Sequence, residues 1–170
     1  SALGQTAHAA DPSFVGVLSL AVEKDVAERL EISDSVRARL LELIDQRENE
    51  ALEIVLSIRD LPAAEQTRRL LPFVSESERM GLALLTVNQR EKLRQIRLAR
   101  EGMEALAEPG LAMALGLSQE QKSEVEQLLE QRASDMTEGG ENERRVTRAI
   151  YERKLAGVLN DSQRAAWEKF

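Results

Sequence analysis

Apolar residues recur with the spacing of an amphipathic helix along nearly the whole chain. After Ser33 they fall at Val36, Leu40, Leu43 and Ile44, a spacing that places them on one helix face. Ser33 is a residue type that favours the N-cap position. No stretch shows the strict apolar–polar alternation that is typical of strands and that is usually rich in β-branched and aromatic residues. The pattern therefore predicts an all-α fold of about seven to eight helices with no sheet.

The apolar spacing, the prolines and the Gly139–Gly140 turn together set the expected helix limits. The predicted helices cover residues 22–31, 34–58, 62–84, 87–106, 109–116, 119–136, 142–158 and 161–170. Pro72 falls inside the third of them, where a proline removes a backbone hydrogen bond and crowds the preceding turn. A bend or break is expected there.

Two stretches of the chain match two later stretches in the same order, which indicates an internal duplication. Residues 26–33 align with residues 111–118 at an offset of 85, and residues 78–96 align with residues 152–170 at an offset of 74. The first copy therefore holds 11 additional residues between its two matching stretches. The predicted organisation is two pseudo-repeats of helical hairpins: a tail and lead-in segment over 1–21, a first repeat over 22–106 and a second over 107–170.

A short motif recurs at three of the predicted helix-to-helix corners. It reads L-T-x-x-Q at residues 85–89, and the later copies have Ser or Asn in place of Thr. The Thr, Ser or Asn side chain suits an N-cap, and a Gln three residues later can reach back to the cap backbone. A structural role at these corners is predicted for Leu85, Thr86, Gln89, Leu117, Ser118, Gln121, Leu159 and Gln163.

In this arrangement the chain resembles the Spy/CpxP family of periplasmic helical proteins, whose shared mark is L-T-x-x-Q. The resemblance covers the corners and their flanking helices. It implies an exported, non-enzymatic protein that needs no cofactor, since the family is known for ATP-independent chaperones, stress-signalling inhibitors and metal-responsive relatives. The chain departs from the family in two respects: family members typically carry one unit, and the His-rich or Met/His metal-binding segments are absent here.

One predicted helix carries a basic stripe formed by Arg90, Arg94 and Arg97, at positions i, i+4 and i+7. The stripe is either a solvated helix face that pairs with neighbouring acids or a binding surface for an acidic part of a client, a partner or an anionic surface. Nucleic acid is not expected as a ligand, because the net charge is −7 and no aromatic residue is interleaved with the arginines.

Composition removes several classes of chemistry. The chain has no cysteine, so disulfides, thiolate metal sites and thiol catalysis are excluded, and its single histidine, His8, leaves almost no material for a His-dependent triad or a multi-His metal site. His8 with Asp11 is either a weak surface metal pair or part of an ordinary tail. Clustered glutamates, such as those at 48–53 and 124–130, lie on wet helix faces rather than in the apolar surroundings that suit a general acid. No catalytic residue, metal site or cofactor is predicted.

The compartment follows from the resemblance more than from the chain itself. Ala7-His8-Ala9 has the small-x-small form of a signal-peptidase site, although no basic and apolar segment precedes it. A periplasmic or otherwise exported location is expected, with the cytoplasm as the alternative. No apolar run is long enough to cross a bilayer, so membrane insertion is not expected.

Two functions from different classes fit these features. The first is an exported protein that binds unfolded clients or a dedicated protein partner without nucleotide, in the manner of a chaperone or an envelope-stress protein. The alternative is a structural or scaffolding subunit of a larger assembly, and a homodimer is compatible with either. A surface that mixes apolar and basic side chains would favour the first, and a large uniform apolar patch would favour the second.

Overall fold

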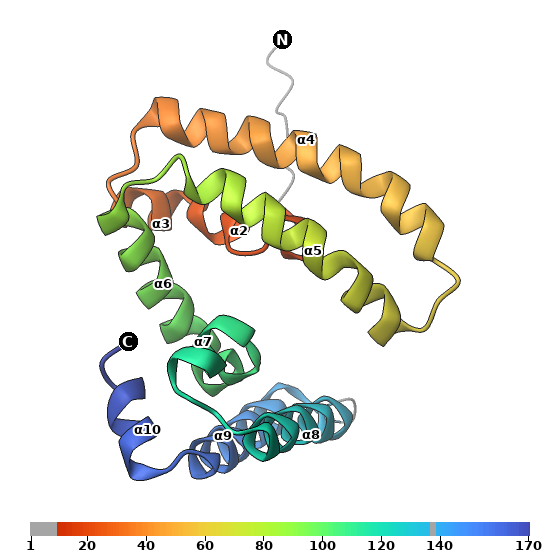
Figure 1. Ribbon diagram of the computed structural model, residues 1–170, viewed down its shortest axis with the longest axis vertical. Coiled ribbons are helices and arrows are strands. Elements are labelled where there is room, and N and C mark those ends of the chain that lie inside the picture. Colours follow the sequence, from red (N-terminus) through yellow and green to blue (C-terminus); the bar gives the residue numbers. More distant parts are fainter. Residues whose placement is uncertain (1–9, 137–138) are drawn as a thin grey trace. The chain divides into compact units, whose positions relative to one another are not determined.

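A computed structural model describes residues 10–136 and 139–170, and the described chain is helical without any strand (Figure 1). The prediction of an all-α fold is confirmed. The helices are α1 (Pro12–Val15), α2 (Leu18–Ala21), α3 (Lys24–Arg29), α4 (Asp34–Ile58), α5 (Ala63–Leu82), α6 (Val87–Glu101), the 3-10 helix η1 (Gly102–Ala107), α7 (Pro109–Ala114), α8 (Gln119–Asp135), α9 (Glu141–Val158) and α10 (Asp161–Trp167). Pro72 lies inside α5, which runs unbroken across it.

The chain divides into two compact units, Ser1–Arg97 and Leu98–Phe170. The division falls within α6, nine residues before the predicted boundary after residue 106. The reason lies in η1, because its buried Ala105 and Leu106 belong to the same core as Val125 of α8 and Leu155 of α9. Residues 98–106 are therefore part of the second unit.

Unit 1 is built on the long hairpin of α4 and α5, which lie side by side (Figure 1). The short helices α1 and α2 pack on both arms of this hairpin. Val15 and Leu18 are fully buried there, and Leu40 of α4 and Leu93 of α6 complete the centre of the core. The described part of the predicted tail and lead-in segment over 1–21 thus contributes two helices to the core.

Unit 2 repeats this plan on a smaller scale. The hairpin of α8 and α9 takes the place of α4 and α5, and η1 packs on both of its helices as α1 and α2 do in unit 1. Leu106, Val125 and Leu155 are almost completely buried at its centre. Trp167 and Phe170 pack against the edge of this core, which agrees with their alignment to Leu93 and Ile96.

The two units also share a backbone turn at matching positions. The helix before each long hairpin ends in the same turn, with the amide of Ile32 bonded to the Ala27 carbonyl at 3.0 Å and the amide of Leu117 bonded to the Ala112 carbonyl at 2.9 Å. The two donors, Ile32 and Leu117, are 85 residues apart, and so are the two acceptors, Ala27 and Ala112. This is the offset of the first sequence match. The residue in the left-handed conformation is also equivalent: Glu31 with φ 55° and Gly116 with φ 65°. This six-to-one bond is the usual way to close such a helix end.

The two units differ most in the length of their hairpins. α4 has 25 residues and α8 has 17, so the additional residues of the first copy lengthen the hairpin of unit 1. We call residues 50–75 the hairpin tip. Three of its leucines are mostly exposed: Leu52 at 56%, Leu56 at 64% and Leu71 at 52%. Their exposure shows that the core does not need them.

Candidate functional site

The corner motifs are closed by their own side chains. The Thr86 hydroxyl accepts the amide of Gln89 at 3.1 Å, and Gln89 Oε1 accepts the amide of Thr86 at 3.0 Å. The same reciprocal pairs form between Ser118 and Gln121 and between Asn160 and Gln163. A buried leucine precedes each cap: Leu85, Leu117 and Leu159. The cap satisfies helix amides that would otherwise lack a partner.

The glutamine amides also join each corner to the neighbouring helix end. Gln89 Nε2 donates to the Glu31 carbonyl at 3.3 Å, and Gln163 Nε2 donates to the equivalent Gly116 carbonyl at 3.2 Å. Gln121 and Gln163 additionally bond to each other in both directions, at 2.7 and 3.0 Å. These side chains are occupied by structural bonds, so the motif does not form a ligand site.

Two glutamates that no sequence motif marks hold an equivalent turn in each unit. Glu78 Oε1 accepts the amide of Val17 at 2.8 Å, and both carboxylate oxygens of Glu152 accept the amide of Met103, at 3.2 and 3.1 Å. Each amide follows a glycine with positive φ, Gly16 at 55° and Gly102 at 61°. The alignment of Glu78 with Glu152 at an offset of 74 is the signal that could have found them.

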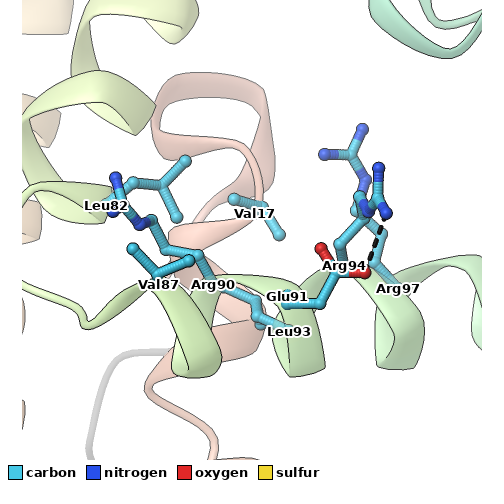
Figure 2. Close-up of a pocket in the computed structure, with 8 residues that line it drawn as sticks. All are labelled: Val17, Leu82, Val87, Arg90, Glu91, Leu93, Arg94 and Arg97. Carbon is cyan, nitrogen blue, oxygen red and sulfur yellow. Dashed lines mark hydrogen bonds and ion pairs between the residues drawn. The ribbon is translucent and has the colours of Figure 1, made fainter. Parts of the chain in front are cut away.

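The three predicted arginines lie together on the wall of a pocket in unit 1 (Figure 2). The pocket has a volume of about 320 Å³, and its lining combines four apolar residues with four charged ones. The lining residues are Val17, Leu82, Val87, Arg90, Glu91, Leu93, Arg94 and Arg97. Such a volume is at the lower end of the range of ligand sites. The basic stripe is therefore one side of a hollow with an apolar floor.

Arg90 lies at the end of the pocket near Leu82 and Val87, whereas Arg94 and Arg97 lie at the other end (Figure 2). Arg94 pairs with Glu91 at 2.8 Å, with both side chains about half exposed. Arg97 is less exposed, at 25%, and its Nη1 lies 3.9 Å from Glu78 Oε1, the oxygen that also accepts the Val17 amide. Glu78 thus holds together two residues of the pocket wall, one from the α1–α2 turn and one from α6.

The second unit has a counterpart for the corner glutamine but not for all of the pocket arginines. Gln89, which the corner needs, has its counterpart in Gln163. Arg94 aligns with Glu168, of opposite charge, and Arg90 aligns with Arg164, which donates to the Leu159 carbonyl at 3.2 Å. The full set of pocket arginines is thus a feature of unit 1 rather than a requirement of the repeated fold.

A second hollow of about 290 Å³ lies between α4 and α5 of unit 1. Its lining residues are Arg39, Glu42, Leu43, Gln46, Met80 and Leu84. One arginine and one glutamate line it, so it has no surplus of either charge. The first pocket, lined by the α6 arginines and called the α6 pocket from here on, is the stronger candidate because three arginines and only one glutamate line it.

The acidic clusters weighed from the sequence take part in local structure or lie on the surface. Glu48 Oε1 accepts the amide of Asp11 at 2.7 Å, and Glu50 pairs with Arg47 at 2.6 Å. Elsewhere, hydrogen bonds from Arg68 and Arg69 lower the pKa of Glu65. These carboxylates hold backbone amides or guanidinium groups.

Across residues 10–136 and 139–170, the structure brings together no group of three or more His, Asp or Glu side chains that could hold a metal ion. His8 and the small residues around it lie outside the described residues, while Asp11 caps α1 through a bond from the Ser13 amide at 2.8 Å. Among the described helices, none combines the length and the apolar character that crossing a membrane requires.

No known family model matches this chain, and searches of curated proteins and of solved structures also find no match. The resemblance to the Spy/CpxP family therefore stays a prediction from the corner motif and the helical pattern. The two units of the chain differ at the pocket arginines and agree at the corners, as described above.

Proposed function

We propose that this protein binds polypeptides without nucleotide, through the α6 pocket of unit 1. The observation that carries the proposal is the lining itself, in which three arginines border an apolar floor. A surface of this kind can take up both apolar side chains and carboxylates, which all unfolded proteins present. Contacts of this sort are individually weak and tolerant of sequence, as chaperone-like binding requires.

The lining of the α6 pocket suits binding better than catalysis. The pocket holds arginines and one glutamate but no nucleophile, and its single carboxylate is paired with Arg94. Catalysis by a general base needs a nucleophile or water held against a free basic group. An exported, chaperone-like or envelope-stress role is the form of polypeptide binding that the corner motif favours.

Light scattering tests the proposal. Two unrelated denatured proteins are diluted into buffer with this protein and without ATP, and suppression of aggregation of both is expected at near-equimolar amounts. The variant R90Q/R94Q/R97Q should suppress much less, because glutamine keeps helix propensity and part of the stem but removes the charge. No suppression by the wild type, or equal suppression by the variant, would reject the proposal.

The matched control is R144Q/R145Q/R148Q. It removes the same charge from three exposed arginines of α9, in the second unit. This control should suppress aggregation as well as the wild type does.

A scaffolding role is the second candidate, and the hairpin tip supports it. Leu52 and Leu56 lie one helical turn apart and are both more than half exposed, as is Leu71 on the facing helix. Such leucines suit a fixed apolar contact. If L52Q/L56Q/L71Q abolishes binding of polypeptides while R90Q/R94Q/R97Q does not, the tip is the binding surface and the α6 pocket is not.

A further inference from the structure

The two ends of the α6 pocket carry the same charge. Arg90 borders one end, and Arg94 and Arg97 border the other (Figure 2). Arg90 and Arg97 are seven residues apart, which is about 10 Å along a helix axis. Val17 and Leu93 form the apolar floor between them, and Leu82 continues it beside Arg90 (Figure 2). The order along the pocket is an arginine, an apolar floor and two further arginines, of which Arg94 pairs with Glu91 and Arg97 lies 3.9 Å from Glu78 Oε1.

The lining has a surplus of positive charge, with three arginines and one glutamate. The whole chain has a net charge of −7, so the pocket differs in sign from the molecule that carries it. Local fields of this kind select oppositely charged partners and repel like ones. The complementary ligand carries negative charge at both ends and an apolar group between them.

We propose that the pocket binds a segment of polypeptide in which carboxylates flank an apolar side chain. The apolar side chain lies on the floor of Val17, Leu82 and Leu93, one carboxylate pairs with Arg90, and the other pairs with Arg94 or Arg97. Guanidinium groups recognise carboxylates through paired hydrogen bonds, which gives direction as well as attraction. This inference rests on the proposed function and specifies its ligand.

A carboxylate ligand fits these residues better than a phosphate polymer does. Half of the lining is apolar, and a phosphate backbone would leave that surface unused. Glu91, which pairs with Arg94, would be close to a continuous row of phosphates along α6 and would repel it, and the net charge of −7 opposes long nucleic acids. A short acidic–apolar segment avoids both penalties.

Fluorescence anisotropy with short labelled peptides tests the inference on the full chain. The probe peptide has a central leucine with a glutamate two residues to either side. In two matched peptides the glutamates are replaced by glutamines, or the leucine by serine. We expect the glutamate–leucine peptide to bind roughly ten-fold more tightly than either, and the preference for glutamate to fall as salt is added.

The protein variants complete the test. R90Q/R94Q/R97Q should lose the preference for glutamate over glutamine, whereas R144Q/R145Q/R148Q should keep it; circular dichroism checks that both variants are folded. Equal binding of the glutamate and glutamine peptides by the wild type would overturn the inference. This result can be obtained with the wild-type protein alone. Tighter, arginine-dependent binding of an oligonucleotide or of inorganic polyphosphate would also overturn it, in favour of a phosphate site.

Failure of this inference can be distinguished from failure of the proposed function. If the wild type suppresses aggregation but does not prefer the glutamate peptide, only the acidic–apolar specificity is wrong. If it neither suppresses aggregation nor binds any of the peptides, polypeptide binding itself is wrong.

Discussion

At the scale of single residues, one glutamate and one glycine set an early turn in each unit: Glu78 with Gly16 in unit 1, and Glu152 with Gly102 in unit 2. The carboxylates of Glu78 and Glu152 each accept an amide that a local helix bond cannot reach, because the preceding glycine turns the chain with positive φ. An unpaired buried amide costs about 1–3 kcal/mol, and a side chain in the left-handed region costs a further ~1–2 kcal/mol. These positions tolerate little change.

Gly102→Ala is expected to destabilise unit 2 by roughly 2–4 kcal/mol, because φ is +61° and a Cβ would lie 2.9 Å from both Glu152 carboxylate oxygens. Gly116→Ala is the control, since φ is +65° but nothing lies within 4 Å of its Cβ, so only about 1 kcal/mol is expected. Trp167 is the sole tryptophan and lies in unit 2, so urea unfolding followed by its fluorescence measures both. Equal losses would contradict the role of Glu152.

Tyr151 gives unit 2 a pH dependence on the alkaline side. Its hydroxyl donates to Asp135 Oδ2, and this bond, together with burial and the Asp135 charge, raises the pKa of Tyr151 above its ordinary value of 10.0. A raised pKa means that the fold favours the protonated form, so this contribution is complete below about pH 10 and is lost as the pH rises through the folded-state pKa.

Tyr151→Phe should therefore unfold more easily than the wild type at neutral pH and lose less stability between about pH 9 and 11. Thermal unfolding at several pH values measures both effects. Parallel pH profiles for the two proteins would show that Tyr151 does not cause the dependence.

At the scale of helices, the corners have different costs of disruption in the two units. Gln163 is buried and makes bonds to Gly116, Gln121 and Asn160, whereas Gln89 is half-buried and makes one long bond beyond its cap. In unit 1 the residue equivalent to Gln121 is Val36, so no glutamine pair can form there.

Gln163→Leu is expected to cost about 2–4 kcal/mol, because it removes the bonds of the Gly116 carbonyl and the Asn160 amide and both bonds to Gln121 in a partly buried corner. Gln89→Leu should cost less than about 1 kcal/mol, since water can reach the groups that it abandons. Fluorescence of Trp167 monitors the first variant and far-ultraviolet circular dichroism the second. The opposite order of the two losses would contradict this account of the corners.

Most helices could be predicted because their apolar spacing and caps extend over several turns. The predicted 34–58 helix agrees with α4 at both ends, and the predicted 161–170 helix ends three residues later than α10. Helices α1 and α2 could not be found in this way, since four residues hold barely one turn of periodic signal. Their place in the core depends on partners far along the chain, such as Glu78 for Val17.

The candidate site could be predicted only in part, for the same reason. Arg90, Arg94 and Arg97 share a helix, so their spacing alone places them on one stripe. The floor of the pocket comes from three different elements, with Val17 after α1, Leu82 at the end of α5 and Leu93 in α6. No local pattern connects these residues, and only the folded chain brings them together.

At the scale of the whole molecule, each unit has its own core, and the two cores share no residue among those described. Unit 2 buries ten apolar residues in a core of its own, which is a small but complete set for a domain of this size. A fragment of residues 98–170 should therefore remain helical by circular dichroism and unfold cooperatively in urea, as followed by Trp167 fluorescence. A fragment without a cooperative transition would show that unit 2 depends on unit 1.

Chemical-shift mapping can show directly whether polypeptide binds at the α6 pocket of unit 1. The ¹⁵N-labelled full chain would be titrated with the glutamate–leucine–glutamate peptide while all backbone amides are observed. We expect the largest changes at Val17, at Leu82 and along residues 87–97, with α8 and α9 unaffected. Changes centred on α8 and α9, or on the hairpin tip, would contradict this expectation.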